Sequence, residues 1–179
     1  MVDLKKRKQL ALHLRRLAGG VISNDEFESN LIEEVTNGWL PEQFYRSKEA
    51  KTGDAAILPL VEESWGLYDD NRSHKLRKSD QLKPETMKQV ARIILFLHSN
   101  QEYQWPYFDI KSPLDHFSLK DFLLLILSLG KNYRDKRRAQ LTGFESFKKA
   151  GDFDYWPFFR KADYEEQLSR QPFLKGSIW

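Results

Sequence analysis

The chain has 179 residues, of which 40% are hydrophobic and 13% aromatic, and its formal net charge is +3 at pH 7. That length fits one domain, and that much apolar surface can form a core, which argues against global disorder. The chain contains no cysteine, which excludes disulfide bonds, thiolate metal sites and cysteine nucleophiles.

The first forty residues predict two amphipathic helices. Leucines recur at helical spacing over residues 3–18, with lysines and arginines on the opposite side, and a Gly-Gly pair follows as a stop. Ser23 and Glu26 then match the capping-box pattern at a helix N-terminus. This second helix is expected to end at the pair Asn37 and Gly38.

The next segment alternates between polar and apolar stretches. Residues 46–53 are polar and predict a loop. Asp54 can cap a third helix, and if that helix begins near Leu58, Pro59 falls in its first turn, where its missing N–H is tolerated. Residues 69–81 hold almost no apolar side chain, so we expect them to be exposed.

Two strongly apolar helices are expected to form most of the core. Pro84 suits the first turn of a helix that runs to about Ser99, and the second half of this helix is apolar on all sides. Ser118 can cap another helix, whose residues 119–129 are the best candidate for the central element of the core. A short final helix is predicted over 162–170.

The fold class that follows is all-α, because no stretch of convincing length alternates between apolar and polar residues as a strand would. We predict one domain over residues 1–179, an irregular bundle of about six helices. Aromatic-proline loops should pack on its core. They are Glu-Tyr-Gln-Trp-Pro-Tyr-Phe at 102–108, Asp-Tyr-Trp-Pro-Phe-Phe at 154–159 and a looser relative at 39–45.

These aromatic-proline segments have two interpretations. Proline biases the residue before it away from helical angles, so a Trp-Pro step forces an extended turn and points the ring in a fixed direction. The rings then either hold loops onto the helical core, as large rings usually do, or line a groove for a partner.

Motifs for catalysis and metal binding are missing from the sequence. It has no Gly-x-Ser-x-Gly and no glycine-rich phosphate loop, and no two of its four histidines share a predicted helical face. We therefore predict no metal and no cofactor. Pairs of acids at 33–34, 62–63 and 69–70 leave an enzyme of unknown reaction class as one alternative.

The leading prediction is a non-catalytic protein-interaction module, a regulatory or immunity-like protein whose partner is another protein. Acidic and aromatic side chains suit steering and anchoring in such an interface. The predicted protein-binding residues are Glu62, Glu63, Trp65, Trp105, Tyr107 and Trp156.

Nucleic-acid binding is the main alternative. Cations beside an aromatic ring suit phosphate contact combined with base stacking. The predicted residues are Lys131, Tyr133, Arg134, Lys136, Arg137 and Arg138, and further basic clusters lie within 5–16 and 74–78.

Charge distribution and hydropathy also bear on location and partners. The charged N-terminal residues are not followed by a signal-peptide-like apolar stretch, and the most apolar run, 122–127, is far shorter than the ~20 residues of a membrane span. We expect a soluble, cytoplasmic protein with no membrane partner. Basic and acidic blocks alternate along the chain, and either pair with each other or form separate faces.

Overall fold

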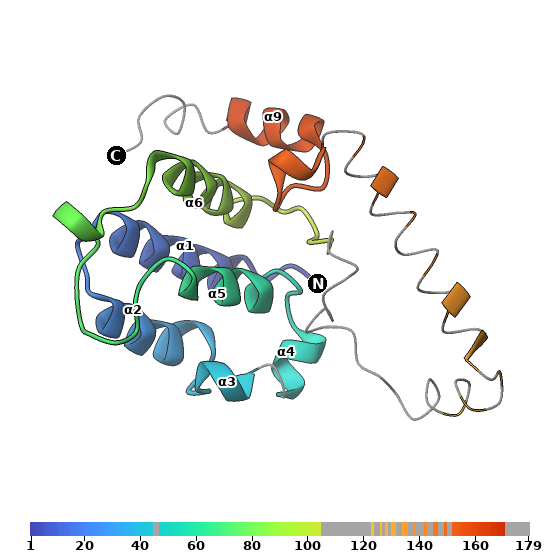
Figure 1. Ribbon diagram of the computed structural model, residues 1–179, viewed down its shortest axis with the longest axis horizontal. Helices are drawn as coiled ribbons and strands as arrows, with labels where there is room; N and C mark the ends of the chain where they lie inside the picture. The colour runs from blue at the N-terminus through green and yellow to red at the C-terminus, as the bar shows by residue number, and fades with distance from the viewer. Residues whose placement is uncertain are drawn as a thin grey trace.

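The computed structural model describes residues 1–44, 47–104 and 152–170, together with isolated residues between 123 and 149 (Figure 1). Within these residues the backbone is largely helical, and its only extended pairing is a single antiparallel bridge between Ser23 and Lys75. The predicted all-α class is confirmed.

Helix α1 (Leu4–Ala18) lies at the centre of the bundle and contacts α2, α5, α6 and the π-helix η1 (Figure 1). The Asp3 side chain caps it by accepting hydrogen bonds from the backbone N–H groups of Lys5 and Lys6. Its predicted leucine stripe is fully buried, because packing an apolar face supplies most of a helix's stability in a protein.

The second predicted helix is present in two parts. Helix α2 (Asn24–Asn30) starts with the predicted capping box, and the chain continues as the π-helix η1 (Leu31–Val35). Asn37 and Gly38 end it in left-handed conformations, with φ of 53° and 86°. The short helix α3 (Pro41–Phe44) follows.

The predicted loop at 46–53 is wrong, because Lys48–Thr52 form the short helix α4. The Ser47 hydroxyl accepts a hydrogen bond from the Ala50 N–H, and Ala50 is buried against the core. A capped turn with one buried alanine is enough to form a helix among otherwise polar residues.

Helix α5 (Ile57–Trp65) begins near Leu58, with Pro59 in its first turn, as predicted. The predicted Asp54 cap is wrong: Ala56 is the N-cap residue and no side chain caps the helix, because the Asp54 carboxylate pairs with Arg7 and accepts from the Ala56 N–H. The following segment is mostly exposed, as expected, and contains the short 3-10 helix η2 (Lys78–Asp80). Within this segment Leu76 is buried, at 3% exposed.

Helix α6 (Pro84–Leu97) packs along α1 and carries proline in its first turn, as predicted. Every side chain from Ile93 to Leu97 is buried, which confirms burial on all sides of its second half. The final helix α9 (Lys161–Arg170) contacts α6.

The sequence predicts that residues 119–129 form the central element of the core. The two apolar side chains that the structure describes in this range are instead exposed. Leu123 is 53% exposed and Ile126 is 54% exposed. The centre is occupied instead by α1, whose buried face meets α5 and α6.

The aromatic-proline segments differ from one another. The 3-10 helix η3 (Asp152–Tyr155) leads into Trp156 and Phe158, which are buried at 3% and 0% exposed and pack on the core as predicted. The Trp156 indole N–H donates to the Tyr103 hydroxyl across 3.2 Å. In the segment 39–45, by contrast, Trp39 is 43% exposed.

Among the described residues, no helix combines the length and the apolar character that crossing a bilayer demands.

Candidate binding groove between α1 and α6

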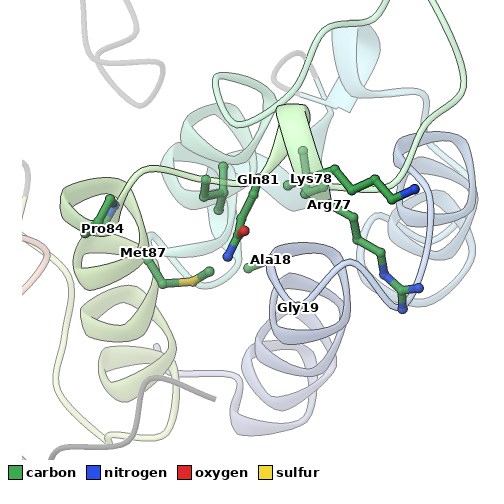
Figure 2. Close-up of a pocket in the computed structure, with 9 residues that line it drawn as sticks. Ala18, Gly19, Arg77, Lys78, Gln81, Pro84 and Met87 are labelled. Carbon is green, nitrogen blue, oxygen red and sulfur yellow. The ribbon is translucent and has the colours of Figure 1, made fainter.

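A groove of about 530 Å³ lies where the end of α1, the segment around η2 and the first turn of α6 meet (Figure 2). Three elements that are distant in the sequence thus contribute to one surface feature. Its lining consists of Ala18, Gly19, Leu76, Arg77, Lys78, Gln81, Leu82, Pro84 and Met87.

The groove has an apolar floor and a basic rim. Ala18, Leu76 and Met87 are buried core residues that reach its floor. Figure 2 shows the Gln81 amide and the Met87 side chain pointing into the space beside Ala18. The side chains of Arg77 and Lys78 extend away from that space on the far side of the segment, and both residues are exposed.

The cations of the rim have no anionic partner in the part of the chain that the structure describes: no ion pair involves Arg77 or Lys78 there. The neighbouring cations Arg72 and Lys75, by contrast, have partners. Arg72 pairs with Asp80 at 2.6 Å, and the Lys75 ammonium donates to the Val21 carbonyl at 2.8 Å. The basic block therefore uses some of its charge internally and presents the rest at the groove.

The backbone of the rim is held in an unusual conformation. Lys78 has a φ of 55°, in the left-handed region that residues other than glycine, asparagine and aspartate rarely adopt. The Arg77 N–H donates to the Lys75 carbonyl, and the Arg77 carbonyl accepts from the Asp80 N–H, so a tight turn holds this geometry. Backbone strain of this kind clusters at binding and catalytic sites.

Gly20 positions the Arg77 side chain. Gly20 has a φ of 63°, and a Cβ there would lie 2.5 Å from the Arg77 Cγ and 2.9 Å from the Leu76 carbonyl oxygen. The aliphatic part of Arg77 therefore packs directly on the glycine backbone, which directs the guanidinium outward.

The predicted acidic surface lies elsewhere, on α5. Glu62 and Glu63 are partly buried and make no ion pair within the described ranges. Burial raises the pKa of both carboxyl groups, and the charge of Glu63 raises the pKa of Glu62 further. Trp65, from the same helix, is half-buried against the core.

The predicted aromatic anchors are only partly described. Trp156 is buried, and its carbonyl accepts a hydrogen bond from the Arg92 side chain at 2.9 Å, so it holds a loop on α6. Trp105 and Tyr107 lie outside the described residues.

Half of the predicted nucleic-acid-binding residues are described. Lys131, Arg134 and Arg138 have helical backbone and exposed side chains. Spacings of three and four residues place such side chains on one helical face. Tyr133, Lys136 and Arg137 lie outside the described residues.

No cluster of three or more potential metal ligands occurs among the described residues. His13 is buried in α1, where its Nε2 lies 2.9 Å from a carboxylate oxygen of Glu34 on η1. This contact joins α1 to the second helix, and it is one place where the basic and acidic blocks pair internally.

Sequence reasoning detected the basic rim of the groove but not the groove itself. The cluster within 74–78 is visible as a charge pattern. The floor is not, because Ala18 and Met87 belong to core-facing stripes that give no sign of ending at a surface.

Comparison of the chain with protein-family models, curated protein sequences and solved structures finds no match.

Proposed function

We propose that the protein is a non-catalytic binding module that takes an acidic segment of a partner protein into the groove between α1 and α6. One observation carries this proposal: Arg77 and Lys78 have no anionic partner in the described structure and lie at the edge of a groove with an apolar floor. The rim attracts carboxylates, and the floor takes an apolar side chain.

The apolar floor favours a polypeptide over a phosphate backbone as the ligand. A phosphate would use the rim alone, whereas a peptide brings carboxylates and apolar side chains together. Met87 also suits such a role, because the flexible and polarisable methionine side chain adapts to ligands of different shape. Paired cations add steering and partner selection.

A direct test uses a fluorescent peptide in which glutamates flank a leucine and a tryptophan, measured by anisotropy at low salt. The double variant Arg77→Gln/Lys78→Gln should bind at least about 10-fold more weakly than the wild type, because each lost charge-assisted hydrogen bond is worth roughly 1.5–3 kcal/mol. The control Lys5→Gln/Lys8→Gln removes the same charge from exposed positions near the other end of α1.

Two further peptides separate the contributions of rim and floor. Replacing glutamate by glutamine should abolish the contribution of the rim, and replacing the leucine and tryptophan by serine should abolish that of the floor. Equal affinity of the wild type and the Arg77→Gln/Lys78→Gln variant for the acidic peptide would refute the proposal. Affinity capture from a lysate with nuclease, using the same pair of proteins, then identifies the natural partner.

Nucleic-acid binding is a second candidate, supported by the exposed cations Lys131, Arg134 and Arg138 on one helical face. Replacing all three by glutamine should weaken binding of a single-stranded oligonucleotide. It should also reduce the slope of log K against log salt by about two to three units. Binding that does not depend on salt would eliminate this candidate.

A further inference from the structure

The turn between η1 and α3 exposes two large apolar side chains next to each other. Trp39 is 43% exposed and Leu40 is 46% exposed, and neither packs against the core cluster of the described residues. Tryptophan is the residue most enriched among the energetically dominant positions of protein interfaces. We call residues 36–40 the Trp39 turn.

Hydrogen bonds hold the Trp39 turn in one shape. The buried Thr36 hydroxyl donates to the Trp39 carbonyl at 2.5 Å, and the Gly38 N–H donates to the Ile32 carbonyl at 2.6 Å. The left-handed conformations of Asn37 and Gly38 reverse the chain between these bonds. A turn that is already ordered loses little conformational entropy when it docks.

Carboxylates precede the Trp39 turn in the chain. Glu33 and Glu34 lie on η1, which leads directly into the turn. Glu33, on the π-helix that leads into the turn, is exposed and makes no ion pair in the described part of the chain. The Trp39 turn and the preceding Glu33 together offer the apolar side chains and the carboxylate that the proposed groove ligand requires.

The groove and the Trp39 turn lie at opposite ends of α2. The groove is at the end of the bundle where α1 stops and α6 begins, whereas the turn lies beyond η1, next to α3 (Figure 1). One chain therefore does not bring its own Trp39 turn to its own groove. A second copy can do so.

We propose that the groove of one copy binds the Trp39 turn of another, with Trp39 and Leu40 on the apolar floor and Glu33 toward Arg77 and Lys78. This inference rests on the proposed function, because it names a second copy as a partner of the same groove. The Met87 sulfur on the floor then gives a favourable contact with the indole ring.

The geometry makes this contact heterologous, meaning that two different surfaces meet. Each bound copy still has an unused groove or an unused Trp39 turn, so association continues into a chain or closes into a ring. The average mass in solution should then rise with protein concentration beyond that of a dimer.

Sedimentation velocity from micromolar to millimolar concentration tests the proposal. The wild type should associate, whereas Trp39→Ala and Arg77→Gln/Lys78→Gln should each remain monomeric. Leu12→Ala is the matched control, because Leu12 is 51% exposed on α1 but lies in neither surface. It should associate like the wild type. A wild type that is monomeric throughout, or a Trp39→Ala variant that still associates, overturns the inference.

Mixing the two monomeric variants gives a sharper result. Trp39→Ala retains an intact groove, and Arg77→Gln/Lys78→Gln retains an intact Trp39 turn. Their mixture should form a one-to-one dimer that grows no further. Failure to form it overturns the inference even if both variants are monomeric alone.

The peptide assay separates this inference from the proposed function. If Trp39→Ala binds the acidic fluorescent peptide with wild-type affinity while the wild type is monomeric, only the self-association is refuted. If no variant binds the peptide but the wild type associates through Trp39, the proposed peptide-binding function is refuted instead.

Discussion

At the scale of single residues, the buried ion pair between Arg7 and Asp54 joins distant segments of the chain. Arg7 is fully buried, and its guanidinium donates to both Asp54 carboxylate oxygens at 2.6 and 2.9 Å. It also donates to the carbonyls of Ser99 and Gln101. Three segments, the starts of α1 and α5 and the chain after α6, therefore meet at one cation.

Replacing Asp54 by Asn should reduce the free energy of unfolding by about 3–5 kcal/mol, because it leaves the charge of Arg7 buried without compensation. Urea denaturation measures the change. The control is Glu85→Gln, which breaks an exposed pair with Lys88 and should change the free energy by less than about 1 kcal/mol. Equal effects would mean that the buried pair is not a structural requirement.

The pKa of Asp54 gives this contact a pH dependence. Burial alone would raise the pKa, but hydrogen bonds from Arg7 and from the backbone N–H groups of Ala56 and Asp3 outweigh it and lower the pKa. The contribution of Asp54 to stability is therefore present above its unfolded-state pKa and is lost as the pH falls through the lower folded-state pKa.

Glu62 and Glu63 should have the opposite dependence. Burial raises the pKa of both, so the folded state binds protons more tightly than the unfolded state, and the stability penalty is relieved as the pH falls from neutral toward the unfolded pKa of about 4.3. The double variant Glu62→Gln/Glu63→Gln should be more stable than the wild type at pH 7, with a difference that shrinks at pH 5. Thermal unfolding at the two pH values checks this, and a difference that grows on acidification would contradict it.

Two glycines allow a steric effect to be separated from a conformational one. Gly20 and Gly38 both have positive φ, but a Cβ at Gly20 would clash with Arg77 and the Leu76 carbonyl, whereas nothing lies within 4 Å at Gly38. Gly38→Ala should reduce the unfolding free energy by about 1–2 kcal/mol from the left-handed conformation alone. Gly20→Ala should reduce it by more and should weaken binding of the acidic peptide, because it displaces Arg77. Equal destabilisation would show that the Arg77 stem does not pack on Gly20.

At the scale of elements, α6 contributes a continuous run of buried side chains from Ile93 to Leu97. Ile94 is 1% exposed in its second half, and Ile94→Ala should reduce the free energy of unfolding by about 2–5 kcal/mol. Leu12→Ala on the exposed face of α1 is the matched control and should change it by less than about 0.5 kcal/mol. Chemical denaturation compares the two, and a small effect at Ile94 would place the core elsewhere.

Elements with strong local signals were predictable from the sequence. The capping box of Ser23 and Glu26 and the first-turn proline of α6 act within a few residues, so their positions follow from the sequence alone. Helix α4 was missed because its one apolar residue, Ala50, matters only once a core exists beside it. The apolar run that contains Leu123 and Ile126 predicts burial, but both side chains are exposed. Hydrophobic periodicity identifies an apolar helix without showing which helix occupies the centre of the bundle.

At the scale of the whole molecule, the alternating charge blocks are used in two ways. Some charges pair internally, as in the contacts of Arg7 with Asp54 and Arg72 with Asp80. Others, including Arg77 and Lys78, are presented at the surface. Charge in this protein therefore both joins elements of the fold and faces the solvent.

This division predicts different responses to salt. Raising the salt concentration should weaken binding of the acidic peptide at the groove, because the exposed cations are screened. It should change the midpoint of urea unfolding only slightly, because the buried pair is screened little and exposed pairs contribute little to stability. Peptide binding that is unaffected by salt would assign the binding energy to the apolar floor alone.

The sequence by itself determined the all-α class, the capped starts of α2 and α6, and the burial of the leucine stripe of α1. These depend on hydrogen bonds and periodicities that act over one or two helical turns. Only the tertiary structure decided that α1 is central, that Arg77 and Lys78 line the same groove as Ala18 and Met87, and that Trp39 is exposed while Trp156 is buried. The physical reason is that burial depends on which distant segments pack together.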